Sequence, residues 1–76
     1  MRIRVRKIKI LQNIMVSVPE LGKDYFYDID LRYHSIPKIE IGKTFFVGKQ
    51  RFGVVTKRIT DNIFETNASR FEFEII

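Results

Sequence analysis

The chain has 76 residues, with 14 lysines and arginines against 9 acidic residues and no cysteine. This length allows one domain, and the absence of cysteine excludes disulfide bonds and thiolate metal sites and fits a reducing compartment. No apolar run approaches the ~20 residues of a membrane span, and the N-terminus, with basic residues at alternate positions, lacks the apolar core of a signal peptide. We therefore expect a single cytoplasmic domain over residues 1–76.

Strand-favouring residues dominate the composition. Ile, Val, Thr, Phe and Tyr number 32, whereas Ala, Leu, Met, Gln and Glu number only 13. β-branched and aromatic side chains lose rotamer freedom on a helix but pack well on a pleated surface. The composition therefore predicts an all-β fold, a small barrel or sandwich of about five to seven short antiparallel strands. Residue types with AT-rich codons (Ile, Lys, Asn, Phe, Tyr and Met) number 34, which indicates a low-GC genome, such as that of a phage, another mobile element or a low-GC bacterium.

The first expected strand covers residues 2–11, where basic and apolar residues alternate. Ile3 and Val5 share one face, but the next apolar pair, Ile8 and Ile10, has the opposite parity. A β-bulge at the two consecutive basic residues between these pairs would return both pairs to one face. The sequence therefore predicts a bulged strand with an apolar inner face and an arginine-rich outer face.

Two further strands are expected before the middle of the chain. Residues 14–18 form a short apolar run that stops at Pro19. Residues 25–33 have apolar or aromatic side chains at every odd position, which is the pattern of a half-buried antiparallel strand. Pro37 marks its end, because proline cannot donate a hydrogen bond to a neighbouring strand.

A tight hairpin is expected in the central part of the chain. Residues 48–50, Gly-Lys-Gln, separate a strand over 39–47 from a second arm that runs from 51 towards 60. In glycine and apolar spacing, residues 39–48 together with 52–55 resemble the central hairpin of SH3-like small β-barrels. This resemblance covers about a quarter of the chain and carries no function with it.

The C-terminal part is expected to form two more strands. The pair Asp61-Asn62 and the run 67–69 supply turn residues on either side of a short strand over 63–66. Residues 70–76 then alternate, with aromatic and apolar side chains on one face and two glutamates on the other.

The sequence offers little for catalysis or metal binding. His34 is the only histidine, and its neighbour Ser35 would point to the opposite side of an extended chain, so the two make a poor nucleophile–base pair. Asp28 and Asp30 would lie about 6.6 Å apart on one strand face, close enough for a hydrated cation but more typical of pairing with basic groups across strands. We expect a protein that is not an enzyme and that uses no cofactor or metal.

Charge is unevenly distributed along the chain. Residues 1–10 and 38–58 each carry a net charge of +5, whereas residues 11–37 carry −2 and residues 59–76 carry −3. The basic blocks and the aromatic side chains near them suggest contacts with a partner. The candidate partner-binding residues are Arg2, Arg4, Arg6, Tyr25, Phe26, Lys43, Phe45, Phe46, Lys49, Arg51, Lys57 and Arg58.

Three functions are compatible with these residues. The first is a non-catalytic module that docks on a partner protein and inhibits or regulates it, with exposed aromatic side chains beside arginine as the contact. The second is a nucleic-acid-binding small barrel, and the third is sequestration of a small anion such as a nucleotide. Against the second, Glu72 and Glu74 on the last strand could neutralise the arginines of the first strand. We also expect a homo-oligomer, because edge strands with apolar neighbours invite pairing.

Overall fold

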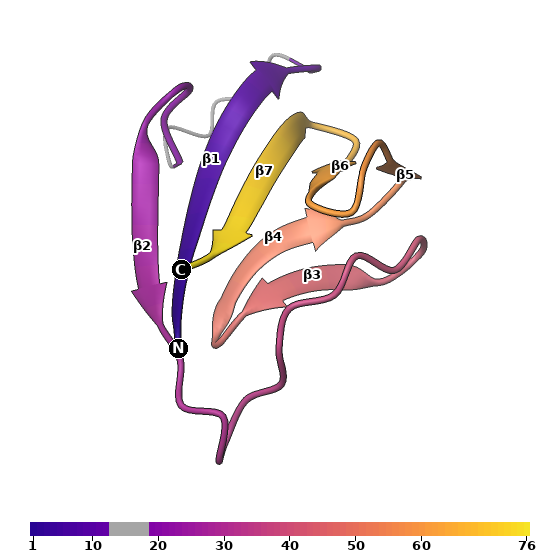
Figure 1. Cartoon of the computed structure of the whole chain (residues 1–76). Helices are drawn as coiled ribbons and strands as arrows, with labels where there is room; N and C mark the ends of the chain where they lie inside the picture. Colours follow the sequence, from indigo (N-terminus) through magenta and orange to yellow (C-terminus); the bar gives the residue numbers. More distant parts are fainter. Residues whose placement is uncertain (13–18) are drawn as a thin grey trace.

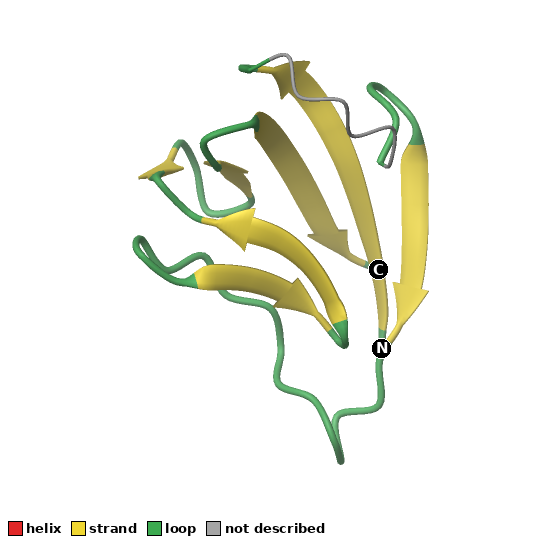
Figure 2. Ribbon diagram, turned by 180° about the vertical axis from the view of Figure 1, so that it is seen from behind, coloured by secondary structure: helices red, strands yellow, loops and turns green. Residues whose placement is uncertain are grey.

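The computed structural model describes residues 1–12 and 19–76, and these residues form seven strands in two antiparallel sheets (Figure 1). No helix occurs among the described residues, as Figure 2 shows, so none that could cross a membrane is found there. The predicted all-β fold is therefore confirmed. The strands, in chain order, are β1 (Arg2–Ile10), β2 (Asp24–Asp28), β3 (Thr44–Val47), β4 (Gln50–Val54), β5 (Lys57–Arg58), β6 (Ile63–Glu65) and β7 (Ser69–Ile75).

The larger sheet has the strand order β2-β1-β7-β6-β5, and β3 and β4 form a separate hairpin. The first and last strands are neighbours, with Ile3 opposite Ile75 and Val5 opposite Phe73. Chain continuity links the two sheets, because β4 leads into β5 through only two residues, 55 and 56. The Thr56 N–H donates to the Glu65 carbonyl at 2.8 Å, so the link is itself attached to β6.

An aromatic cluster fills the space between the sheets. Phe45 of β3 is fully buried, and its ring centroid lies 4.3 Å from that of Phe64 on β6 and 5.1 Å from that of Phe73 on β7. Phe52 of β4 makes an edge-on contact with Phe71 of β7 at 5.5 Å. The hairpin is thus held on the five-stranded sheet by aromatic contacts, which bury large areas per residue and favour such offset geometries.

The first strand has a bulge, but its position differs from the expected one. The register against β7 shifts between Lys7 and Lys9, and alternation continues inward from Val5 to Lys7. Lys7 is therefore buried on the inner face, whereas Ile8 and Ile10 are exposed. The prediction that these two isoleucines join the inner face was wrong, because the shift comes after Lys7 rather than before it.

The strand expected over 25–33 is shorter than its alternation suggests. β2 ends at Asp28, and the N–H of Ile29 still donates to the Met1 carbonyl at 2.8 Å. The register between β2 and β1 runs from Asp24 opposite Arg6 to Asp28 opposite Arg2. The chain then turns, with the Asp30 carbonyl accepting hydrogen bonds from the backbone of residues 33 and 34, and Leu31 and Tyr33 are exposed.

The central hairpin is confirmed, although both arms are shorter than expected. Gly48 and Lys49 form its two-residue turn, and Gly48 has a positive φ of 60° that suits glycine. The first arm begins only at Thr44, because residues 40–43 form a turn with Gly42 at φ 86°. The second arm divides into β4 and β5. The strand expected over 14–18 lies outside the described residues.

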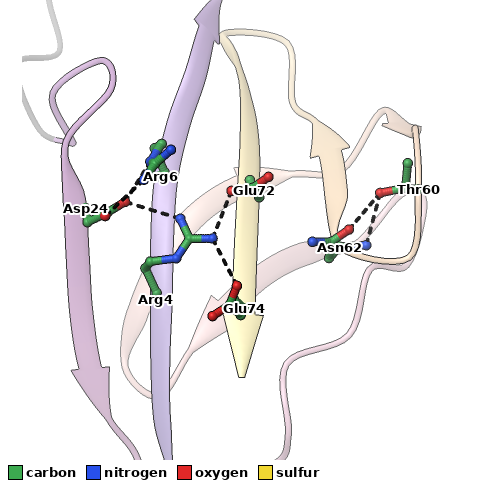
Figure 3. A network of polar contacts seen from close by, with 7 residues as sticks. All are labelled: Arg4, Arg6, Asp24, Thr60, Asn62, Glu72 and Glu74. Atoms are coloured by element: carbon green, nitrogen blue, oxygen red, sulfur yellow. Dashed lines mark hydrogen bonds and ion pairs between the residues drawn. The ribbon is translucent and has the colours of Figure 1, made fainter. Parts of the chain in front are cut away.

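The two C-terminal strands and the turn before them agree with expectation. β6 and β7 pair directly, and their inner faces carry phenylalanines. In the turn from β5 to β6, the Thr60 hydroxyl donates to Asn62 Oδ1 at 2.9 Å and accepts the Asn62 N–H at 3.3 Å (Figure 3). This local bonding holds the expected Asp61-Asn62 turn, a common role of short polar side chains.

Candidate functional site

The arginines of β1 lie on the outer face of the five-stranded sheet, in contact with carboxylates of both neighbouring strands. Arg4 is central: its guanidinium contacts Asp24 at 3.2 Å, Glu72 at 2.9 Å and Glu74 at 3.5 Å (Figure 3). Only 13% of the Arg4 side chain is exposed. The geometry follows from strand order, because β1 lies between β2 and β7 and alternate residues of all three point outward.

The other two arginines pair with β2. Arg6 donates two hydrogen bonds to Asp24 in a bidentate arrangement, one from Nε at 2.6 Å and one from a terminal guanidinium nitrogen at 3.0 Å. Arg2 lies 3.5 Å from Asp28 and its guanidinium sits 5.3 Å from the centroid of the Phe26 ring. The arginines expected to meet a partner are thus engaged within the fold, and Asp24 is a counter-charge that sequence reasoning did not identify.

Asp24 makes the stability of this network depend on pH. The hydrogen bond from Arg6 lowers the pKa of Asp24, and Arg4 adds to the effect while desolvation opposes it. A carboxylate whose folded pKa is lowered stabilises the protein above its unfolded pKa of about 3.9, and that stability is lost as pH falls through the folded pKa. We expect the urea midpoint to drop between about pH 5 and about pH 2, and Asp24→Asn to make the drop smaller.

A matched control for this pH profile is available in the β5–β6 turn. Asp61 is fully exposed, and its one ion pair among the described residues is with Arg58, at 3.3 Å. Asp61→Asn should leave the dependence of the urea midpoint on pH nearly unchanged from that of the unaltered protein. If Asp24→Asn and Asp61→Asn give the same profile, measured by urea unfolding followed by circular dichroism, the assignment of the pH dependence to the network is contradicted.

The basic residues around the central hairpin do not form one continuous patch. Lys43 pairs with Glu40 at 3.0 Å, and Arg58 with Asp61 as described. Lys57 stands opposite Glu65 in the register of β5 and β6. Among the residues that the structure describes, Lys49 and Arg51 have no carboxylate within 4.0 Å. The same holds for Lys57, because Glu65 pairs with Arg70 at 2.6 Å. Lys49, Arg51 and Lys57 are therefore the candidate cations here that remain available to a partner.

The adjacent candidates Phe45 and Phe46 have opposite roles. Phe45 belongs to the core and is inaccessible, which corrects its place among the partner-binding residues. Phe46 is 46% exposed on the outer face of the hairpin, directly opposite Arg51 of β4. Consecutive residues of a strand point to opposite faces, so only one of this pair can reach a partner.

The candidate aromatics of β2 also divide between the two faces. Phe26 is 51% exposed on the outer face beside Arg2. Tyr25 is half-buried, its hydroxyl accepts the Glu20 N–H at 3.0 Å, and the Lys23 ammonium lies 5.4 Å from its ring centroid. Phe26 is therefore a candidate contact, whereas Tyr25 is engaged locally.

A depression of about 470 Å³ lies beside the outer face of β3. Its lining includes Tyr33, Ile36 and Phe46, with Lys38 and Lys43 among its polar residues. Ile36 is 45% exposed. It lies in the loop after β2, whose first residues, 29–33, were expected to continue the strand. The loop and β3 together create a recess, with mixed polar and apolar lining, that no single sequence segment encodes.

The acid–base and metal candidates remain apart in the structure. His34 lies in the loop after β2, and Ser35 follows it without a hydrogen bond to it among the described residues. Asp30 pairs with Arg32 at 2.8 Å in a turn, whereas Asp28 contacts Arg2 on the sheet. Within residues 1–12 and 19–76, no group of three or more potential metal-binding side chains was found.

Besides Asp24, Lys7 also escaped sequence reasoning. Lys7 is 6% exposed and lines a pocket between β1, β4 and the turn from β6 to β7. The available signal was parity, since Lys7 continues the odd-numbered series begun by Ile3 and Val5.

Comparisons with protein-family models, with curated proteins and with solved structures found no match to this chain.

Proposed function

We propose that the protein is a non-catalytic binding module that docks on a partner protein through the outer face of its central hairpin. The observation that carries this proposal is an exposed aromatic ring beside an arginine: Phe46 stands opposite Arg51, and Val54, 48% exposed, stands opposite Thr44. Aromatic and arginine side chains are the residues most often responsible for binding energy at protein interfaces. We call these four residues the hairpin face.

The recess beside the hairpin face supports the same proposal. Tyr33 and Ile36 extend the apolar surface of Phe46 around a hollow of about 470 Å³, large enough for an apolar side chain of a partner. Lys43 and Glu40 in its lining pair with each other at 3.0 Å, and Lys38 leaves the recess with a net positive charge. The complementary partner surface would present an apolar anchor surrounded by acidic groups.

Nucleic-acid binding is the weaker alternative because of the contacts made on the five-stranded sheet. Arg4 and Arg6 already have carboxylate partners within 3.2 Å, and a phosphate would have to displace them. Phosphate binding depends on cations that are free to exchange their counterions. Inhibition of the partner, a cytoplasmic location and a phage or mobile-element origin are part of the proposal and remain predictions.

The test is capture from the source cell followed by measurement with the purified partner. Phe46→Ala should weaken binding at least about tenfold, because it removes the central exposed ring of the hairpin face. Phe26→Ala is the matched control, since Phe26 is equally exposed and also lies beside an arginine but belongs to β2. We expect Phe26→Ala to bind like the unaltered protein in isothermal titration calorimetry.

Three outcomes would contradict this proposal. If Phe46→Ala and Phe26→Ala weaken binding of the partner equally, the contact does not lie on the hairpin face. Capture that disappears with nuclease and weakens steeply with salt would favour nucleic acid. A purified protein whose mass by light scattering is a multiple of 9.1 kDa, and whose oligomer Phe46→Ala disrupts, would show that the hairpin face serves self-association, the homo-oligomer expected from the sequence.

A further inference from the structure

The inner face of β1 carries a lysine where the alternation calls for an apolar residue. Lys7 follows Ile3 and Val5 in the inward series, and only 6% of its surface is exposed. Its ammonium lies 6.0 Å from the centroid of the Phe71 ring, at the limit of a cation–π contact. A lysine this buried is normally paired, because removing its charge from water costs free energy.

No counter-charge for Lys7 is present among the described residues. None of their carboxylates lies within 4.0 Å of the Lys7 ammonium, and no hydrogen bond from it to another described residue occurs. Residues 13–18, outside the described part of the chain, contain no acidic residue in the sequence and so supply no carboxylate. Among the described residues, the Lys7 ammonium is therefore not paired with any carboxylate.

The Lys7 side chain lines a pocket of about 250 Å³. Phe52 and Phe71 contribute aromatic walls, and Ile10 adds an aliphatic one. The turn from β6 to β7 closes another side with Thr66 and Ser69. The pocket thus combines a buried cation, two hydroxyl-bearing residues and flat apolar surfaces, the composition usual for a small-molecule site.

Ser69 is a second polar residue of this pocket, and its side chain has no hydrogen bond to a described residue. The Thr66 hydroxyl accepts N–H groups of Ala68 and Ser69, both at 3.2 Å, which holds the turn in one conformation. Ser69 itself is only 4% exposed. Its hydroxyl is available as a donor to a ligand in the pocket that Lys7 also lines.

From these observations we infer that the pocket is a binding site for a small organic anion. The ligand would carry a phosphate monoester or carboxylate that pairs with Lys7 and accepts from Ser69, and a planar apolar group that lies against Phe52 and Phe71. The pocket volume is below the ~300–1,000 Å³ of drug-sized sites, so the ligand is small. This inference does not depend on the proposed docking function, because Phe46 and the recess beside it take no part in this pocket, although Arg51 of the hairpin face also lines it.

The experiment compares three probes by ¹⁵N–¹H NMR titration of the full chain. Phenyl phosphate carries both the anion and the ring, inorganic phosphate only the anion, and benzyl alcohol only the ring. We expect saturable shifts of the amides of Gly53, Ser69 and Phe71 with phenyl phosphate. Inorganic phosphate and benzyl alcohol should each bind at least about tenfold more weakly, because each lacks either the ring or the anion.

Variants identify the residue that binds the anion. Lys7→Met keeps the length of the side chain but removes its charge, and should weaken phenyl phosphate binding at least about tenfold. Lys9→Met is the matched control, because Lys9 is on the same strand but exposed, and should bind like the unaltered protein. Ser69→Ala removes one oxygen atom and should weaken binding severalfold, and it tests the same site if Lys7→Met fails to fold.

Thermal unfolding supplies a readout that is independent of affinity. Without a probe, Lys7→Met should unfold at about the same temperature as the unaltered protein, because it keeps the length of the side chain and breaks no ion pair with a described residue. Phenyl phosphate should raise the melting temperature of the unaltered protein and not that of Lys7→Met. The inference is overturned if no probe gives saturable shifts at these amides, or if Lys9→Met loses as much affinity as Lys7→Met.

Discussion

Replacing Phe45 with alanine is expected to destabilise the protein by about 3–5 kcal/mol, the usual cost of deleting a buried phenylalanine ring. Phe45 is fully buried, and its ring meets those of Phe52, Phe64 and Phe73. A domain of this length has a total stability of about 4–11 kcal/mol, so the variant should lose a large part of its stability and unfold at a much lower urea concentration. Urea unfolding followed by circular dichroism measures the loss.

The neighbouring residue provides the control for this prediction. Phe46→Ala removes the same ring from the same strand, but on the exposed outer face. Its stability should change by no more than about 1 kcal/mol, while binding of the partner protein is lost. Equal destabilisation by the two substitutions would show that the hairpin does not pack on the larger sheet as described.

Arg4→Glu should be the most disruptive charge change in the chain. It would place a fourth carboxylate among Asp24, Glu72 and Glu74, which lie within 3.5 Å of the present guanidinium. Because Arg4 is only 13% exposed, solvent screens this repulsion less than at an ordinary surface position. We expect a loss of about 1–3 kcal/mol, measured by urea unfolding at neutral pH.

Two further variants test whether this loss arises from coupling between strands. Glu72→Lys combined with Arg4→Glu restores opposite charges across β1 and β7 and should recover much of the stability, as a double-mutant cycle would show. Arg2→Glu is the matched control on the same strand face, where 57% exposure and a single carboxylate at 3.5 Å predict a small effect. Equal losses from Arg2→Glu and Arg4→Glu would contradict the central role of Arg4.

Local patterns predicted the features that depend on a few consecutive residues. The all-β class follows from the excess of β-branched and aromatic residues, whose packing preference acts at every position. The central hairpin follows from Gly48, which takes the positive φ that its two-residue turn requires. The alternation of residues 70–76 correctly placed Phe71 and Phe73 inward, with Glu72 and Glu74 outward.

The sequence by itself thus determined the fold class, the hairpin and the faces of the last strand, because turn chemistry and alternation are local. Only the tertiary structure decided where β2 ends, since alternation continues to Tyr33 but the pairing with β1 stops near Ile29. It also decided that Asp24 neutralises Arg6, and that Lys7 rather than Ile8 faces inward. These features depend on which strand lies beside which and on where the register shifts, and distant segments settle both only when they pack together.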